Sequence, residues 1–356
     1  VRLALVDRRR PLGGRSRHCG GDGRGLSEAS ERHALPWQAP AARPLRRLTI
    51  AAALDPGWRY SPAIARHLAR CPFPPARTPV ACAVSGGADS LALLALAAAA
   101  DLKVTAYHVD HGLRSGSATE ADLVRSAARD VGAEMVALSV TVDPGPNLEA
   151  RARDARYSVL PPDVLTGHTA DDRAETILLN LLRGSGLSGL TGLRPTGGPS
   201  GRVGHPLLSL RRSDTEDVCR LLGWTPFIDP SNSDRSLLRN RIRLEILPLL
   251  EGAAGRDLVP ILLRQADLLT DDADLLDQLA RSIDPADARA LAEAHPALAR
   301  RAIRSWLTTT HPPDAATIER VLAVARGEAV ACEIPGGIRV SRKNQTLSRD
   351  PLDTHD

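Results

Sequence analysis

The stretch Val80–Ala100, VACAVSGGADSLALLALAAAA, decides the fold. Its first part, Val80–Val84, is a continuous apolar run that ends at a Ser-Gly-Gly turn signal, a pattern that predicts a short buried strand. Alanine and leucine fill the part after the turn, and both are strong helix formers. A strand, a tight turn and a helix are therefore expected in immediate succession.

The turn, SGGADS, is typical of a phosphate-binding loop. Two adjacent glycines permit backbone conformations that a Cβ atom would forbid. Their N–H groups can then converge on an anion at the helix N-terminus, where unpaired donors and the helix dipole favour negative charge. A turn without a ligand is the alternative, but such a turn has no need of an aspartate and two serines. We therefore predict nucleotide contacts from Ser85, Gly86, Gly87, Ala88, Asp89 and Ser90.

The chain lacks the lysine of a Walker A loop, which needs Gly-Lys-Ser/Thr. Its two lysines, Lys103 and Lys343, do not follow a glycine. The SGGADS sequence instead resembles the pyrophosphate loop of the ATP-pyrophosphatase (PP-loop) superfamily. This resemblance implies an enzyme that splits ATP into AMP and pyrophosphate and passes an adenylated intermediate to a nucleophile.

Length and composition exclude several classes of protein. The 356 residues suffice for about two or three domains, and no apolar run approaches the ~20 residues of a membrane span. The five cysteines have no CxxC spacing, so neither a zinc site nor a disulfide framework is indicated and a cytoplasmic setting is expected. Residues 1–70 carry 14 arginines and five acidic residues, which gives this segment a net charge of 14 − 5 = +9. The whole chain has a net charge of +4, so the remaining residues are net negative, at 4 − 9 = −5. An RNA-binding face must therefore be a local cluster.

Residues 1–45 show no sustained periodicity and many Gly, Pro and Arg residues, so we expect them to be disordered. They lack the apolar core of a signal peptide. Because the segment begins with Val and resembles translated GC-rich noncoding DNA, we expect an upstream extension from a mis-assigned start codon. A basic RNA-binding arm is the alternative.

From Val80 onward, predicted strands and helices alternate. Strands are predicted at 80–84, 103–109, 134–140 and 163–166, and helices at 118–131, 147–160, 170–183, 211–222 and 237–250. This alternation predicts a parallel, doubly wound α/β sheet with helices on both faces. Ligands bind beyond the carboxyl ends of such strands, and Ser85, His108 and Gly167 follow three of them. This convergence predicts an active site.

The remainder of the chain predicts a loop and a second domain. Residues 184–204 are rich in Gly, Ser and Pro and are expected to form a mobile loop. Further helices are predicted at 260–283, 285–293, 296–307 and 314–326, with a terminal hairpin at 333–347. We divide the chain into the 1–45 extension, a catalytic ATP-binding domain at 50–250 and a mainly helical domain at 252–350.

Two motifs accompany the predicted phosphate loop. In HVDHGLR, His108 is a candidate for nucleotide contact, and Arg114 can pair with phosphate through its planar fork. In EARARDARY, the arginines fit either a solvated helix face with charge pairs or a supporting part of the site. For the second role we favour Arg151 and Tyr157 over Arg153.

Carboxylates and arginines form the last two motifs. In TGHTADDRAET, Asp172 and Glu175 are three residues apart and lie on one helical face, where they suit Mg²⁺ on ATP phosphates or an ammonium group. Helix capping is the alternative, and it explains Asp171 well but Glu175 less well. In RNRIR, Arg239–Arg243, the arginines exceed what a turn needs and suit RNA phosphates or an anionic transition state.

These five motifs, in this order, closely resemble the tRNA(Ile)-lysidine synthetase family. The resemblance covers roughly Val80–Leu250 and, more weakly, Arg300–Arg349. It implies a PP-loop α/β domain that uses ATP to join L-lysine to C2 of the wobble cytidine of a minor tRNA(Ile) with a CAU anticodon. It also implies Mg²⁺, for which Asp89 and Asp172 are the candidate ligands. The sequence leaves a homodimer open.

The resemblance also implies roles for single residues. The catalytic candidates are Asp89, Asp172, Glu175 and Arg241. The candidates for binding lysine or tRNA are Asp172, Glu175, Arg239, Asn240 and Arg243. In the implied mechanism, cytosine O2 attacks the α-phosphate of ATP, and the lysine ε-amine then displaces AMP from C2.

Three other functions stay open. A PP-loop tRNA thiolase usually needs active-site cysteines, and Cys82, near the loop, lies within the predicted strand. An amidating synthetase shares SGGxDS but does not require the arginine cluster. A non-catalytic ATP-binding module leaves both the carboxylate pair and the arginine cluster unexplained.

Overall fold

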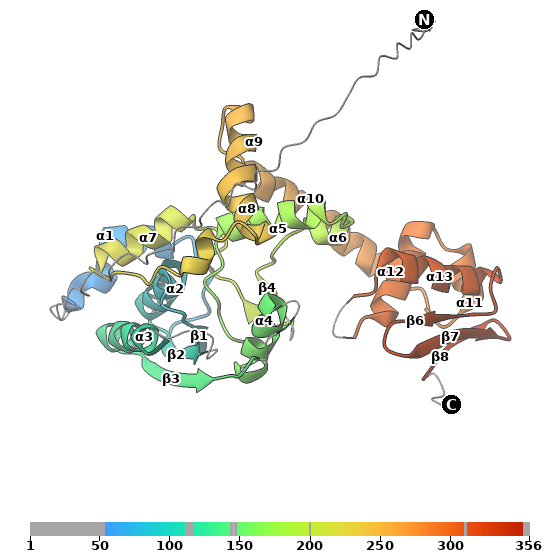
Figure 1. Cartoon of the computed structure of the whole chain (residues 1–356), viewed down its shortest axis with the longest axis horizontal. Coiled ribbons are helices and arrows are strands. Elements are labelled where there is room, and N and C mark those ends of the chain that lie inside the picture. The colour runs from blue at the N-terminus through green and yellow to red at the C-terminus, as the bar shows by residue number, and fades with distance from the viewer. Residues whose placement is uncertain are drawn as a thin grey trace, which may run out of the picture. The chain divides into compact units, whose positions relative to one another are not determined.

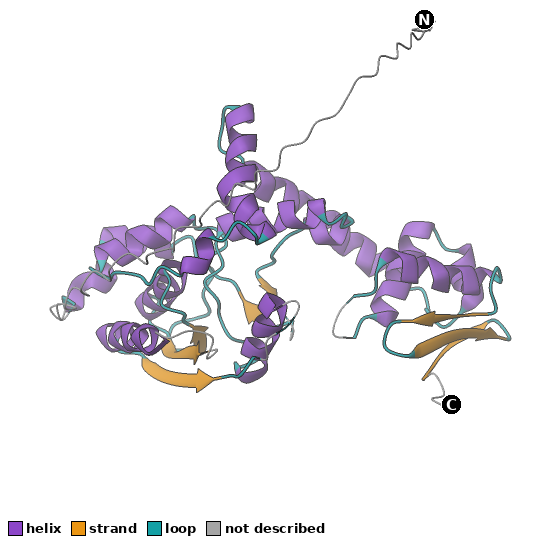
Figure 2. Cartoon of the chain, in the orientation of Figure 1, coloured by secondary structure: helices purple, strands orange, loops and turns teal. Residues whose placement is uncertain are grey.

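Figures 1 and 2 show the computed structural model, which describes residues 54–110, 117–142, 145, 148–198, 201–309 and 312–351. The predictions for residues 1–45 and for Arg114 lie outside the described residues. The first elements are a 3-10 turn (Pro56–Tyr60), α1 (Pro62–Leu68), β1 (Pro79–Ala83), α2 (Ala88–Ala99), β2 (Lys103–Asp110), α3 (Ser117–Val131), β3 (Glu134–Ser139) and α4 (Leu148–Val159). They are followed by α5 (Ala170–Leu182), α6 (Leu187–Leu190), β4 (Thr196–Gly197), β5 (Val203–Gly204), α7 (Arg212–Leu221) and α8 (Leu238–Arg241).

A parallel sheet lies at the centre of this part of the chain. Strands β1, β2 and β3 pair in that order, all parallel. Leu165 continues the sheet beyond β1, because it forms parallel bridges with Cys82 on one side and Gly204 of β5 on the other. The predicted strand at 163–166 is thus a one-residue bridge, and the predicted parallel α/β sheet is confirmed.

Helix α2 is the core of this part. Every residue from Ser90 to Ala98 is buried, because α2 packs against β1 and β2, against α3 and against α7 (Figure 1). A helix that is apolar on all sides is expected to be buried in this way. Its N-terminus follows directly from β1, so the packing fixes the position of the predicted phosphate loop.

Residues 184–204 are more ordered than predicted. They contain α6 and the antiparallel pair of β4 and β5. The backbone N–H of Thr166 donates to the Gly204 carbonyl at 2.9 Å, so this hairpin completes the edge of the sheet. The expectation of a mobile loop is therefore wrong for the described residues. Although the segment is rich in Gly, Ser and Pro, part of it forms backbone hydrogen bonds with the edge of the sheet.

The helix predicted at 237–250 is divided. It consists of α8, a π-helical turn (Ile242–Ile246) and α9 (Leu247–Ala254). A π turn inserts an extra residue, and such turns are frequent at functional sites. Here the turn contains Arg243, the last residue of the arginine cluster.

The C-terminal part has its own core. Its elements are α10 (Val259–Ala280), α11 (Ala288–Glu293), α12 (Pro296–Leu307), α13 (Ala315–Arg326), β6 (Ala331–Ile334), β7 (Ile338–Lys343) and β8 (Thr346–Pro351). The three strands form an antiparallel sheet, one strand more than the predicted hairpin. The second turn, at Asn344 and Gln345, has positive φ angles of 49° and 64°. It contains no glycine, so the sequence lacks the usual signal for such a turn. No helix in the described part of the chain is long and apolar enough to cross a membrane.

Candidate active site

A cavity of about 840 Å³ lies beyond the carboxyl end of β1, within the ~300–1,000 Å³ that is usual for small-molecule sites. It is lined by the SGGADS loop, the loop before α5, the beginning of α7, the segment 225–232, and residues of α4 and α8. Strand-end loops distant in sequence therefore meet here, as the alternation of strands and helices predicts.

The SGGADS loop presents the N-terminus of α2 to the cavity. Gly86 has a φ of +84°, which favours glycine. Ser90 Oγ accepts from the Ser85 backbone N–H at 3.1 Å and donates to the Gly87 carbonyl at 2.9 Å, so the serines hold the loop closed on itself. Gly87 is the N-cap of α2 and provides no side-chain cap. The first N–H groups of α2 can therefore bind an anion.

Gly167 brings the loop before α5 against the first turn of α2. A Cβ atom at Gly167 would lie 2.6 Å from the Asp89 carbonyl oxygen and 3.0 Å from the Ser90 backbone nitrogen. Only glycine permits this approach without a shift of the backbone. The position of the phosphate loop relative to α5 thus depends on Gly167.

The two carboxylate oxygens of Asp172 accept hydrogen bonds from different partners. Its Oδ2 accepts from the Thr169 backbone N–H at 2.8 Å and hydroxyl at 2.9 Å, so Asp172 caps α5. Its Oδ1 faces the cavity and accepts from Arg239 at 2.9 Å. Asp171, in contrast, does not cap α5 but binds Arg211 and the backbone N–H of Arg212. The expectation that capping explains Asp171 is therefore wrong.

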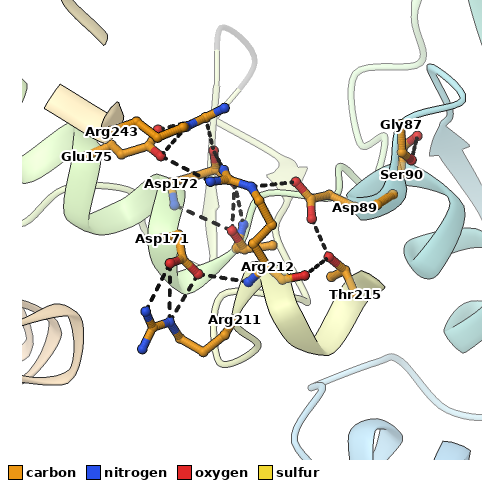
Figure 3. Close-up of polar contacts among 12 residues, drawn as sticks. Gly87, Asp89, Ser90, Asp171, Asp172, Glu175, Arg211, Arg212, Thr215 and Arg243 are labelled. Atoms are coloured by element: carbon orange, nitrogen blue, oxygen red, sulfur yellow. Dashed lines mark hydrogen bonds and ion pairs between the residues drawn. The ribbon is translucent and has the colours of Figure 1, made fainter. Parts of the chain in front are cut away.

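Glu175 is the deepest charge of the site, with 1% of its side chain exposed. Arg243 donates to its two oxygens at 2.6 and 3.0 Å, and Arg239 donates at 3.1 Å. Arg239 and Arg243 are four residues apart on α8 and the π turn, so both reach α5. Figure 3 shows Arg243 beside Glu175. The structure thus brings together four of the predicted site residues, Asp172, Glu175, Arg239 and Arg243.

Arg212, at the start of α7, was missed by the sequence analysis. Its guanidinium lies 3.4 Å from Asp172, 3.4 Å from Glu175 and 3.7 Å from Asp89 (Figure 3). It therefore links the phosphate loop to the carboxylate pair. A cation at a helix N-terminus opposes the helix dipole, and this local conflict is the signal that could have identified Arg212.

Asp89 is the carboxylate whose charge is least stabilised. Burial, and then the nearby charge of Asp172, raise its pKa to about 6, although Thr215 donates to its Oδ1 at 2.5 Å. Burial also favours the neutral form of Asp172, but Arg239 and Arg212, together with the Thr169 N–H, hold its pKa at about 2. Both carboxylates are thus mainly ionised at pH 7, but Asp89 takes up a proton far more readily than Asp172.

Two histidines share the hydroxyl of Thr166 behind the carboxylates. Thr166 Oγ1 lies 2.8 Å from His168 Nδ1 and 2.6 Å from His205 Nδ1. Burial lowers the pKa of His168 to about 3 and that of His205 to about 4. Both imidazoles are therefore neutral at pH 7. His168 lies at the cavity, whereas His205 directly follows β5 and contacts Thr166 and His168.

Several predicted residues lie outside the cavity lining, among them Gly86, His108, Glu175, Asn240 and Arg241. His108 is 2% exposed and its Nδ1 donates to the Val84 carbonyl at 2.9 Å, so it supports the strand that leads into the phosphate loop. Asn240 donates to two carbonyls of the 231–234 turn and holds that turn. Arg241 is 53% exposed and faces Glu245 at 3.8 Å. For Arg241, a catalytic role finds no support in its position.

Helix α4 contributes a cationic wall. Arg153, Arg156 and Tyr157 line the cavity, and the Arg153 guanidinium stacks over the Tyr157 ring at 5.1 Å. Burial lowers the pKa of Arg156, because removal from water destabilises the charged guanidinium group. Arg151, which the sequence favoured over Arg153, is not part of the lining. The order of preference is therefore reversed by the structure.

The donor set suits Mg²⁺ only together with a phosphate. Among the described residues, no group of three or more His, Cys, Asp or Glu residues is arranged to hold a metal by itself. Mg²⁺ usually binds one or two carboxylates plus substrate phosphates. Asp89 fits this role, because a cation would relieve the charge repulsion that raises its pKa. Asp172 fits less well, since its oxygens already serve Thr169 and Arg239.

Known proteins match the chain over most of its described length. The model of a PP-loop domain matches residues 61–250, a little over half of the chain, and that of a TilS substrate binding domain matches residues 287–347. A tRNA(Ile)-lysidine synthase of Nocardia farcinica is 43% identical over 264 residues, which cover 70% of this chain and 79% of the relative. One of Mycolicibacterium paratuberculosis is 42% identical over 293 residues, covering 76% and 90%. Among solved structures, the U34-tRNA thiolase NcsA of Methanococcus maripaludis aligns with a TM-score of 0.47 and 18% identity, over 58% of this chain and 78% of that chain.

Proposed function

The chain belongs to the tRNA(Ile)-lysidine synthase family, and we propose that it joins lysine to C2 of the wobble cytidine of a tRNA(Ile) with a CAU anticodon. ATP drives the reaction, and AMP and pyrophosphate leave. One observation carries the proposal: a single cavity combines an anion-binding loop with the buried carboxylate Asp172, and the buried Glu175 shares the arginines of Asp172. The loop suits ATP, and the carboxylates suit an ammonium group.

In the first step, cytosine O2 attacks the α-phosphate of ATP and pyrophosphate leaves. Hydrogen-bond donors around the separating phosphates stabilise the developing charge. The candidates are the N–H groups at the start of α2, the Ser85 hydroxyl, and the guanidinium groups of Arg153 and Arg156. Asp89 and the phosphates would hold Mg²⁺, which supplies further charge neutralisation when bound. The wobble base reaches the cavity at low cost, because an anticodon loop is single-stranded.

In the second step, the lysine ε-amine attacks C2 of the activated base and AMP leaves. Asp172 lines the cavity, and Glu175 lies three residues further along α5 and binds the same arginines. Together they would orient the ε-ammonium. Their burial strengthens this attraction, because the local dielectric is lower than that of water. A neutral side chain such as that of leucine would form no ion pair with these carboxylates, so they favour a basic amino acid.

A sulfur-transfer reaction is not favoured. Cys82 is fully buried, and burial raises its pKa to about 12. Cys219, on α7, is also buried, with its pKa raised to about 12 by burial and by Asp89. A thiol must ionise to act as a nucleophile, so neither group can carry sulfur at neutral pH. The amidating and non-catalytic alternatives leave the arginines around Glu175 without a function.

Incorporation of labelled lysine tests the proposal. The full chain is incubated with ATP, labelled lysine and bulk tRNA, and both label in tRNA and AMP are measured. We expect lysine in tRNA and AMP in equal amounts, and neither product when ATP is left out. Label in tRNA without ATP, or AMP without a tRNA product, contradicts the proposal.

A further inference from the structure

The three carboxylates that Arg212 contacts form an ion-pair cluster with an equal number of guanidinium groups. The acids are Asp89, Asp172 and Glu175, and the bases are Arg212, Arg239 and Arg243. Each oxygen of Asp172 and Glu175 already accepts at least one hydrogen bond from a described residue. The cluster thus has no excess negative charge with which to bind another cation.

A lysine ammonium at this cluster would therefore be unfavourable as the site stands. Only 1% of the Glu175 side chain and 10% of the Asp172 side chain are exposed, so water cannot compensate an added charge. Uncompensated charge in a buried site is strongly unfavourable. One guanidinium group has to leave before an ammonium group can take its place.

Arg212 is the guanidinium group that can leave most easily. Its distances to Asp172 and Glu175 are both 3.4 Å, whereas Arg239 and Arg243 hold Glu175 at 2.6–3.1 Å. Its side chain is 26% exposed, about as much as those of Arg239 (28%) and Arg243 (24%), and all three line the cavity, so the longer contacts are what distinguish Arg212. Of these three arginines it is also the one with a contact to Asp89 within the phosphate loop, at 3.7 Å. Arg212 thus lies between the two predicted binding regions (Figure 3).

We propose that Arg212 is a further catalytic residue, which leaves the carboxylates when ATP binds and pairs with the ATP phosphates. A guanidinium group binds phosphate through two parallel, charge-assisted hydrogen bonds, which are stronger than its long contacts here. Its departure frees Asp172 and Glu175 for the lysine ε-ammonium. ATP and lysine then bind cooperatively, and each raises the affinity of the other by the same factor. The inference rests on the proposed function, in which lysine is a substrate.

Titration of lysine into the full chain by calorimetry tests this coupling. The probes are α,β-methylene-ATP, which resists cleavage at the reacting bond, and adenosine as a matched ligand without phosphates. We expect lysine to bind at least about tenfold more tightly in the presence of the nucleotide analogue and without change in the presence of adenosine, because only phosphates attract Arg212. Equal lysine affinity with both probes overturns the inference. This comparison uses the unaltered protein, so it does not depend on the folding of a variant.

Substitution of Arg212 measures its contribution to the coupling between nucleotide and lysine binding. We expect Arg212→Met to bind lysine without nucleotide about as tightly as the unaltered protein does with nucleotide, and to lose the coupling. AMP formation by the variant should have a lower kcat while the KM for lysine falls. Arg220→Met is the matched control, since it removes an exposed arginine of the same helix that pairs with Asp217, and it should keep the coupling. Coupling that persists in Arg212→Met overturns the inference.

Lysine transfer to tRNA separates this inference from the proposed function. If the unaltered protein transfers lysine but its lysine affinity does not respond to nucleotide, the inference alone is overturned. If it transfers no lysine to tRNA under any condition, the proposed function is overturned, and the inference with it.

Discussion

Asp89 connects the phosphate loop to α7, because its Oδ1 accepts a hydrogen bond from Thr215 at 2.5 Å. An asparagine can accept the same bond but carries no charge. We therefore expect Asp89→Asn to fold and to bind tRNA, while ATP-dependent AMP formation falls by about 100-fold or more, since charge stabilisation at the phosphates is lost. AMP release and tRNA retention on a filter measure the two properties.

The control for this variant is Asp101→Asn, which removes an exposed carboxylate just beyond the other end of α2. Asp101 has a φ of 58°, a conformation that asparagine tolerates. AMP formation should stay at the level of the unaltered protein. AMP formation by Asp89→Asn at that same level would mean that the loop has only a structural role.

His205 makes the stability of the protein depend on pH. Its pKa is lowered to about 4 by burial, then by Arg153, whereas the ordinary pKa of histidine is about 6.5. Between these values the unfolded chain binds a proton that the folded protein does not, so stability is present above pH 6.5 and is lost as the pH falls toward 4. At pH 5 this loss amounts to about 1–2 kcal/mol for the one group.

We expect His205→Gln to remove that dependence, because glutamine does not titrate in this range. Urea unfolding at pH 7 and at pH 5 measures it: the free energy of unfolding of the variant should change less between the two values than that of the unaltered protein. The same change in both proteins would show that His205 is charged in the folded state at pH 5.

At the scale of residues, the sequence indicates the groups that act within one motif but not those that join motifs. The spacing of Asp172 and Glu175 places both on one face of a helix, and the structure brings them together at the cavity. Arg212 could be singled out only as a cation at a helix N-terminus, because its distance to Glu175 depends on how α7 lies against α5. The exposed position of Arg241, in contrast, follows from helical spacing, since residues 239 and 243 share one face of a helix and residue 241 does not.

At the scale of elements, the loop before α5 contacts the first turn of α2 through Gly167. A methyl group there would lie 2.6 Å from the Asp89 carbonyl, so the first turn of α2 would have to move. We expect Gly167→Ala to lower the free energy of unfolding by about 1–3 kcal/mol and to raise the KM for ATP. Denaturant unfolding and ATP-dependent AMP formation measure the two effects.

Gly186→Ala is the matched control. Gly186 precedes α6 with a φ of −74°, and no atom lies within 4 Å of a Cβ atom built there. Its stability should stay within about 0.5 kcal/mol of the unaltered protein. If both variants lose the same stability and keep the same KM for ATP, the close approach at Gly167 has no special role.

At the scale of elements, the sequence predicts those that are defined by their own periodicity. Helices α2, α3, α5 and α13 lie where the apolar pattern places them, and so do strands β1 and β2. The pair β4 and β5 has two residues in each strand, too few for any pattern, and exists because it pairs with the sheet beside Leu165. The prediction was thus limited where tertiary pairing, and not local sequence, decides the structure.

The described part of the chain contains two large hydrophobic cores that share no residue. One surrounds α2 and includes Leu94, and the other lies among α11, α12, α13 and the terminal sheet and includes Leu322. The predicted phosphate loop belongs to the first part alone, because it is the N-terminus of α2. A ligand of that loop therefore stabilises the first core directly.

From these separate cores we predict two thermal transitions for the full chain, of which α,β-methylene-ATP raises only one. At about 100 times its Kd the analogue should add about 2.7 kcal/mol to the stability of the part that binds it. Leu94→Ala and Leu322→Ala assign the transitions, since each removes a side chain that is 0% exposed and should cost about 2–5 kcal/mol in its own core. Calorimetry should show Leu94→Ala lowering the transition that responds to nucleotide and Leu322→Ala lowering the other. A single transition that moves as a whole in both variants would mean that α10 couples the two cores into one cooperative unit.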